Sequence, residues 1–321
     1  MTTFKEIRGT AIQVVSSDPA NPEGGQIWYN SSSGTLKGSQ YSSAWSSGGN
    51  INTARAFGAG AGTQTAGLIF GSFPQAAPNG ASESYNGSAW TTTSALISGM
   101  GQNAGTGSQT AALGIGGYNP GFSSTVQSWN GSTWTSAGAL NTGRCGAGAA
   151  GTQTAALAFG GQPSPTGATE KYNGTSWTSV NNMNTARRHL GGGGTQTAAL
   201  GYAGYDTNVT TATESYNGTS WTNINSMNTA RFYINKNGGT QTSALAASGY
   251  TATAAAPAAE LWNGTSWTNS TIQTTARYNM YGAASSGSSA LIAGGSGVPT
   301  GSPTATEEWT QGFGTKTITV S

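Results

Sequence analysis

Charge, cysteine, histidine and long apolar runs are all scarce in this chain, and each scarcity excludes a class of protein. Only 7% of the 321 residues are charged and the formal net charge is +2, which leaves no long-range attraction for nucleic acid or for an anionic membrane surface. Cys145 is the only cysteine and His189 the only histidine. Neither a disulfide framework nor a metal centre built on several Cys or His residues can therefore form within one chain.

Segments that would take the chain into or across a membrane are not evident either. No apolar run approaches the roughly 20 residues that a membrane-spanning helix needs. Residues 1–9 lack the apolar core of a secretion signal. We therefore expect no membrane insertion, although a composition rich in Gly, Ser, Thr and Asn is typical of proteins that work outside cells.

The chain does contain a repeat. The string G-T-Q-T-A, or a close variant, occurs six times at steps of 43 to 48 residues. It begins at Gly62, Gly107, Gly151, Gly194, Gly239 and, in degraded form, Gly287. Units that recur at this period cannot bury their apolar faces alone, so they must pack on one another in a line or in a ring.

Each unit predicts about four short antiparallel strands. The segment after T-Q-T alternates large and small uncharged side chains, which is typical of a strand buried on both faces. An Asn-Gly pair between a Tyr or Trp and a later Trp predicts a type I′ hairpin whose two aromatic rings pack across the strands. Four strands in a unit of about 45 residues indicate an all-β fold, a β-propeller with one blade per unit.

Arg and Glu each keep one position in five of the six units. The second unit has lost both, with Met100 and Gln127 at these positions. Because a buried charge without its partner is costly, this joint loss indicates that Arg and Glu pair within one unit. The expected structural pairs are Arg55 with Glu83, Arg144 with Glu170, Arg187 with Glu214, Arg231 with Glu260, and Arg277 with Glu307. They leave few charged residues for a catalytic site.

The number of blades depends on the first 50 residues. Trp45 precedes Trp90 by one repeat length, so residues 1–50 behave as a degenerate first unit. We favour seven blades, with this unit closing the ring against the last one. In the alternative, the six repeats of residues 51–321 form six blades and residues 1–50 are an N-terminal attachment module.

The repeat resembles a known family. The array N-T-A-R, G-T-Q-T-A-A-L-A-F-G-G and T-E-x-Y-N-G-T-S-W resembles kelch repeats and, more closely, the kelch-like propeller proteins of marine bacteriophages. Residues 25–36, G-Q-I-W-Y-N-S-S-S-G-T-L, are similar to a segment of phage tail-fibre proteins, and residues 315–321 to a closing strand of the same propeller proteins. The resemblance implies a virion structural or host-recognition role. The protein would be made in the host cytoplasm, with other virion proteins and further copies of itself as partners.

Candidate binding residues lie between the second and third strands of the units, where length and sequence vary. Loops on a rigid scaffold are where binding residues concentrate, and aromatic and amide side chains suit stacking on sugars and bonding to hydroxyl groups. The candidates are Tyr118, Asn119, Phe122, Tyr205, Asp206, Asn208 and Tyr250. We expect a host-surface glycan as ligand. In the alternative, a purely architectural capsid or tail decoration protein, these residues are only tolerated loop positions.

An enzyme of the kelch type, either an oxidase or a carbohydrate-active enzyme, is a weaker hypothesis. The copper oxidases of this class use several Tyr, His and Cys ligands, which a single His189 and a single Cys145 cannot supply. Glu307 and Glu308 are adjacent, so in a strand they project to opposite faces and cannot act as a carboxylate pair. We therefore expect no catalytic residue, no metal and no cofactor.

The remaining residues have structural interpretations. Cys145 is expected to be a small buried side chain, and His189 an ordinary residue of a first strand that follows Arg187. An intracellular adaptor would carry a second domain, for which only residues 1–50 are available.

Overall fold

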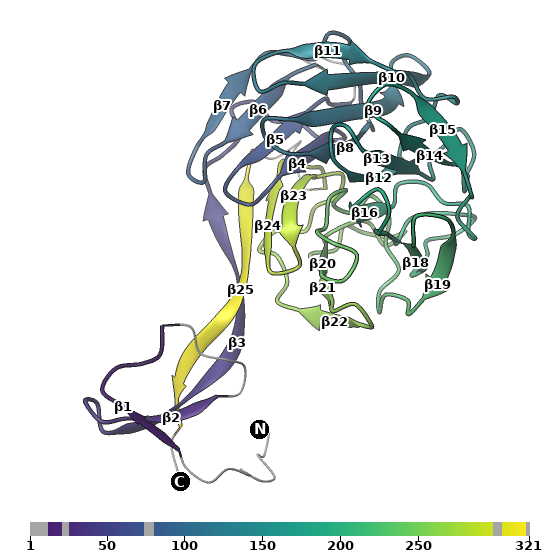
Figure 1. The fold of residues 1–321 in the computed structure, drawn as a ribbon. Coiled ribbons are helices and arrows are strands. Elements are labelled where there is room, and N and C mark those ends of the chain that lie inside the picture. The colour runs from purple at the N-terminus through teal and green to yellow at the C-terminus, as the bar shows by residue number, and fades with distance from the viewer. Residues whose placement is uncertain (1–11, 21–25, 74–79, 298–303, 319–321) are drawn as a thin grey trace. The chain divides into compact units, whose positions relative to one another are not determined.

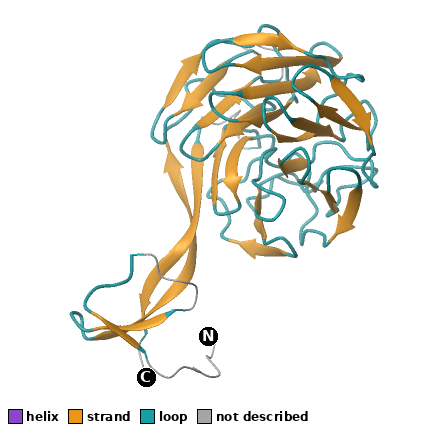
Figure 2. Cartoon of the chain, viewed as in Figure 1, coloured by secondary structure: helices purple, strands orange, loops and turns teal. Residues whose placement is uncertain are grey.

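The computed structural model describes residues 12–20, 26–73, 80–297 and 304–318. All regular structure in these residues is β-strand (Figure 2). The chain divides into two compact units, Trp45–Thr310 and a smaller one formed by Met1–Ala44 with Gln311–Ser321. The boundary falls inside strands β3 (Thr35–Gly48) and β25 (Thr306–Thr317). Residues 311–318 therefore belong to the smaller unit, whereas the sequence analysis counted them with the repeats.

The larger unit is a β-propeller, which confirms the predicted fold class. Its sheets lie around a common centre, with β4, β8, β12 and β16 on the inside (Figure 1). From the innermost strand outward, the first blade holds β4 (Ala59–Gly62), β5 (Gly67–Phe70), β6 (Ser82–Tyr85) and β7 (Trp90–Thr93), and the second β8 (Ala104–Gly107), β9 (Ala112–Tyr118), β10 (Phe122–Trp129) and β11 (Trp134–Ala137). In the same order, the third holds β12 (Gly148–Gly151), β13 (Ala156–Phe159), β14 (Thr169–Tyr172) and β15 (Trp177–Val180), and the fourth β16 (Gly191–Gly194), β17 (Ala199–Tyr202), β18 (Thr213–Tyr216) and β19 (Trp221–Ile224).

The last two sheets differ from this pattern. The fifth holds the three strands β20 (Ala244–Ala247), β21 (Ala259–Trp262) and β22 (Trp267–Ser270). The sixth holds β23 (Tyr281–Ser286) and β24 (Ser289–Ala293), then β25, and β3 as the outer strand of the blade. A strand from the N-terminal part thus completes the blade formed by the last repeat.

Six backbone hydrogen bonds close a circle around the propeller axis. One residue of each repeat takes part, and its N–H donates to the carbonyl of the residue before it in the circle, with N–O distances of 2.6 to 3.0 Å for five of the bonds. All six residues have positive φ, between 53° and 64°. They are Phe57, Gln102, Gly146, His189, Tyr233 and Asn279, and we call them the axial ring. A closed circle of six residues, one from each repeat, corresponds to six blades.

The first 50 residues do not add the expected seventh sheet among the described residues. Strands β1 (Gln13–Val15) and β2 (Ile27–Asn30) instead extend the sheet of β3 and β25. Trp45 lies in the outer strand of the sixth blade, where its ring centroid is 5.2 Å from that of Trp309. Its spacing from Trp90 therefore marks the outer strand of a blade and not a whole preceding unit. The sheet order agrees with the alternative in the number of blades, but residues 45–48 belong to the sixth blade and not to a separate module.

The Gln of the T-Q-T string joins each of five blades to its predecessor. Gln109 Nε2 donates to the Gly67 carbonyl at 3.1 Å, and the same bond recurs from Gln153, Gln196 and Gln241 to the equivalent carbonyls. Gln64 Nε2 donates to the Trp309 carbonyl at 2.8 Å, which ties the first blade to the sixth. The constant Gln is thus part of the scaffold.

The Asn-Gly hairpins have the predicted aromatic pair but a different turn. Tyr172 faces Trp177 across the strands with ring centroids 4.9 Å apart. The loop has four residues, and only Gly174 among them has positive φ, whereas a type I′ turn needs it at both central residues. The prediction fails because the Asn173 side-chain oxygen accepts the N–H groups of the third and fourth loop residues, each at 2.9 Å.

The smaller unit is organised around a half-buried carboxylate. Asp18 accepts hydrogen bonds from Trp28 Nε1 at 3.0 Å, Asn30 Nδ2 at 2.7 Å and Lys37 Nζ at 2.8 Å. These bonds, that from Lys37 first, lower the pKa of Asp18 to about 2. Trp28 is fully buried, so this network holds the loop after β1 against the sheet.

Candidate functional site

Most charged residues of the propeller form ion pairs in its interior. All five expected Arg–Glu pairs are present, each within its own unit, with N–O distances of 2.6 to 3.0 Å. Arg187 and Glu214 are both fully buried, and Arg187 Nη1 also donates to the Ala203 carbonyl. The second oxygen of Glu214 accepts the Asn184 N–H at 2.7 Å. These ten residues are therefore unavailable as a surface site.

In the second unit, neutral side chains take the place of the Arg–Glu ion pair. Gln127 Oε1 accepts the Ile97 N–H at 2.7 Å, and Gln127 Nε2 donates to the Ser98 carbonyl at 2.8 Å. Met100 is 1% exposed in the place of the Arg. An amide thus makes the backbone contacts that the carboxylate makes elsewhere, and no charge is left unpaired.

Aromatic side chains gather at the end of the axis that carries the axial ring. The residue before each ring position bonds to a residue of the variable loop. Arg188 and Tyr205, for example, exchange two backbone hydrogen bonds of 2.9 Å. The rings nearby form a continuous chain, with neighbouring centroids 4.5 to 6.4 Å apart. This aromatic face comprises Phe57, Phe73, Tyr118, Phe122, Tyr205, Phe232, Tyr233, Tyr250 and Tyr278, all half-buried or exposed.

The structure brings four of the seven candidate binding residues together on this face: Tyr118, Phe122, Tyr205 and Tyr250. The polar candidates bond within or near their own loops instead. Asn119 Nδ2 donates to the Gly99 carbonyl, and Asp206 Oδ1 accepts the Asn208 N–H at 2.7 Å. Their contacts are those of loop-stabilising residues.

Sequence reasoning missed five members of the aromatic face. Phe57, Phe232, Tyr233 and Tyr278 lie one or two positions after the constant Arg, and Phe73 lies at the start of a variable loop. The available signal was the variation at these positions, where residues as different as Gly, Gln, His and Tyr stand in equivalent places. Only the closed ring shows that they meet.

A polar sector interrupts the aromatic face. Gln162 Nε2 donates to Gln102 Oε1 at 3.1 Å and lies 2.9 Å from Cys145 Sγ. Burial raises the pKa of the Cys145 thiol, in line with its expected role as a small buried side chain. Arg188 Nη1 donates to Gln162 Oε1 at 2.9 Å, and the guanidinium carbon lies 5.0 Å from the Tyr205 ring centroid.

His189 belongs to the axial ring and not to a first strand, which corrects the expectation. It is 5% exposed, and its ring centroid is 4.2 Å from that of Tyr233. Burial, then the positive charges of Lys236 and Arg188, hold the pKa of His189 well below its usual value. The imidazole is therefore neutral at neutral pH and packs as an aromatic ring.

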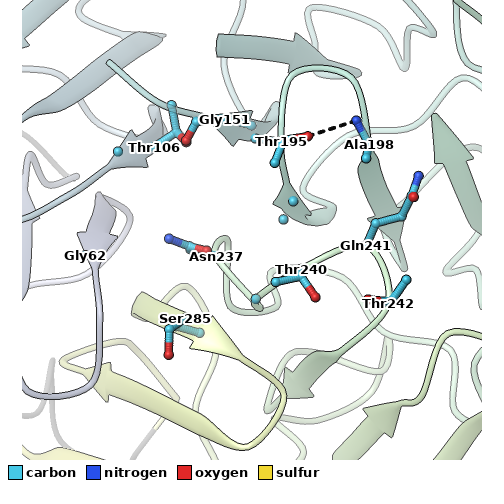
Figure 3. Close-up of a pocket in the computed structure, with 17 residues that line it drawn as sticks. Gly62, Thr106, Gly151, Thr195, Ala198, Asn237, Thr240, Gln241, Thr242 and Ser285 are labelled. Atoms are coloured by element: carbon cyan, nitrogen blue, oxygen red, sulfur yellow. Dashed lines mark hydrogen bonds between the residues drawn. The ribbon is translucent and has the colours of Figure 1, made fainter. Parts of the chain in front are cut away.

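The other end of the axis holds a cavity of about 320 Å³ (Figure 3). The axial ring precedes the innermost strands, whereas this cavity is lined at their far ends by Gly, Ala and Thr, among them Gly62, Gly151 and Thr195. Asn237 lies near the middle of the labelled residues in Figure 3. The lining of the cavity includes no aromatic or charged side chain.

Within residues 12–20, 26–73, 80–297 and 304–318, no group of three or more His, Cys, Asp or Glu side chains is placed to hold a metal ion. No helix in the same residues is long and apolar enough to cross a membrane.

No model of a known protein family matches the chain, and a search of curated proteins finds no match. The fold itself defines the class, a β-propeller of six blades with an aromatic face at one end of its axis.

Proposed function

We propose that the protein is a non-enzymatic structural protein of a bacteriophage particle, a tail fibre or appendage, that binds a host-surface glycan through the aromatic face. The observation that carries this proposal is the continuous chain of partly exposed rings at one end of the axis. Aromatic side chains offer flat apolar surface with a polar edge, which complements the apolar faces and hydroxyl rims of sugars.

The distribution of charge supports a binding role over catalysis. Ten charged residues are used in buried pairs. Glu308, the neighbour of Glu307, accepts a hydrogen bond from the Tyr85 hydroxyl. Catalytic acids and bases need partners set for proton transfer, and the residues of the aromatic face are almost all uncharged.

The virion assignment rests on sequence resemblance. The repeats resemble those of kelch-like phage proteins, and residues 25–36 resemble a segment of phage tail-fibre proteins. Other virion proteins and further copies of this chain are the partners that this role requires. A purely architectural decoration protein is the second candidate, and the bonding of Asn119, Asp206 and Asn208 near their own loops favours it.

The proposal can be tested by glycan-array binding of the purified chain and of two variants with one Tyr removed from each. Tyr250→Ala removes a half-buried ring from the aromatic face, and Tyr29→Ala removes a partly exposed ring from the smaller unit. We expect Tyr250→Ala to weaken binding about tenfold, or ~1.4 kcal/mol, and Tyr29→Ala to leave it unchanged. A chain that is incorporated into particles but binds no glycan would favour the architectural role.

A further inference from the structure

Arg188 is the one arginine of the propeller without a carboxylate partner. The other five are paired with Glu, whereas no ion pair among the described residues includes Arg188. Its Nη1 bonds to the neutral oxygen of Gln162, and its guanidinium stacks on Tyr205. Stacking and one hydrogen bond hold the group in place without neutralising its charge.

A second unpaired cation lies close to the same end of the axis. Lys236 is 6% exposed, and its Nζ donates to the Asn103 carbonyl at 2.6 Å. Lys236 comes from the fifth repeat and Asn103 from the second. Next to Lys236, Asn237 forms a parallel bridge with Gly192 of β16. A side chain would not fit at Gly192, because its Cβ would lie 2.8 Å from the Phe159 ring.

The positive charge of Lys236 is retained at neutral pH. Burial lowers the pKa of Lys236 to about 8, so the amine remains mostly protonated at pH 7. Asp206 is the carboxylate nearest in sequence to Tyr205, and its Oδ1 accepts hydrogen bonds from the N–H groups of residues 207 and 208. Among the described residues near the aromatic face, the two cations Arg188 and Lys236 thus outnumber the single carboxylate of Asp206.

Several buried hydrogen-bond donors near this end lack partners among the described residues. Arg188 Nε and Asn279 Nδ2 are both buried, and no partner among the described residues accepts from either. Buried donors in folded proteins are nearly always satisfied. The Nε atoms of the five paired arginines lack partners too, so the feature that points to a ligand with acceptor oxygens is the half-buried guanidinium of Arg188 without a carboxylate.

We propose that the glycan bound by the aromatic face is acidic, and that a carboxylate on it pairs with Arg188 while a sugar ring stacks beside Tyr205 and Phe232. The inference rests on the proposed function and adds the chemical class of the ligand. A guanidinium binds a carboxylate through two parallel N–H donors, and among the described residues Arg188 donates only through Nη1, to Gln162 Oε1. Charge pairing at a half-buried site adds more affinity than at an open surface.

The test compares oligogalacturonate, its carboxyl-reduced neutral form and a sulfated galactan as probes, in titrations with the full chain. We expect oligogalacturonate to bind at least tenfold more tightly than the reduced form. Arg188→Gln should bring the affinities for the acidic and neutral forms to within about twofold of each other. Arg188→Lys keeps the charge but loses the two-donor geometry, so it should recover only part of the preference. Lys171→Gln removes a half-buried charge from the outer part of the third blade and should have no effect.

The outcomes separate the two proposals. Equal binding of acidic and neutral probes, or an acidic preference that survives Arg188→Gln, overturns the acidic ligand but leaves the glycan-binding function. A preference for the sulfated galactan that depends on Arg188 replaces carboxylate by sulfate as the recognised group and refutes the inference as stated. Binding of none of the probes, and of no glycan on an array, defeats the proposed function itself. If Arg188→Gln does not fold by circular dichroism, the loss of preference in Arg188→Lys decides the question.

Discussion

The two ends of the propeller axis are built from the same repeat, yet one varies and the other does not. At the cavity end, Gln side chains join the blades and Gly residues such as Gly151 hold positive φ. At the other end, the axial ring is closed by backbone atoms alone. Side chains that the scaffold needs cannot change, whereas those of the axial ring are free to differ. This freedom supports our proposal that recognition residues collect at the ring end.

The largest effect on stability should come from breaking one buried Arg–Glu ion pair of the propeller. Arg231→Met leaves Glu260 buried and unpaired, which should cost about 3–5 kcal/mol of unfolding free energy. The double variant Arg231→Met with Glu260→Gln copies the second repeat and should recover most of the loss. Denaturant unfolding of both variants measures the difference. A double variant as unstable as the single one would show that the pair does not act as a unit.

The second largest effect concerns Lys236, and it should be stabilising. Its pKa is about 8 in the folded chain and near 10.4 in the unfolded chain, so the unfolded state binds the proton more tightly. The stability penalty is full below pH 8 and is relieved as pH rises from 8 towards 10. Lys236→Met should therefore raise the unfolding free energy at pH 7 by roughly 1–3 kcal/mol.

The control for this prediction is the pH profile. The gain from Lys236→Met over the wild type should shrink between pH 7.5 and pH 9.5 in parallel thermal unfolding experiments. A gain that is constant across this range would mean that Lys236 is not the titrating group.

A comparable loss is expected at the cavity end from Gln196→Ala. The change removes the hydrogen bonds from Gln196 Nε2 to the Ala156 and Tyr172 carbonyls, at a cost of about 1–3 kcal/mol. Thr222→Ala, an exposed outer-strand change in the same repeat, serves as control. Thermal unfolding should separate the two variants, and equal melting temperatures would argue that these bonds add nothing.

The smallest effect should come from the ring end. Asn279→Gly relieves a positive φ of 54° and removes a buried amide nitrogen without a partner. Because glycine adopts this conformation without strain, stability should change by less than about 1 kcal/mol. A large loss in denaturant unfolding would show that the axial ring needs its side chains as well as its backbone.

The sequence predicted the features that each repeat carries within itself. The strands, the aromatic pair across each hairpin and the five Arg–Glu pairs follow from spacing and from the joint loss at Met100 and Gln127. Four of the seven candidate binding residues also proved to share one face. The strands, the hairpin pairs and the Arg–Glu pairs are properties of one repeat, which comparison of the repeats is sufficient to indicate.

Features that depend on ring closure were beyond sequence reasoning. Trp45 has the spacing of a full unit, but only the sheet order shows that it completes the sixth blade. Phe57, Tyr233 and Tyr278 are far apart in the chain and meet because the circle closes between Phe57 and Asn279. The turn type was missed for a different reason, the capping of the loop by the Asn173 side chain.

The most direct measurement compares glycan binding by two double variants, one at each end of the axis. Phe232→Ala with Tyr250→Ala alters the aromatic face, and Asn237→Ala with Ser285→Ala alters the cavity lining. With both variants folded, our account predicts that the first loses array binding by at least a hundredfold and that the second binds as the wild type does. The reverse pattern would place recognition in the cavity and contradict the account.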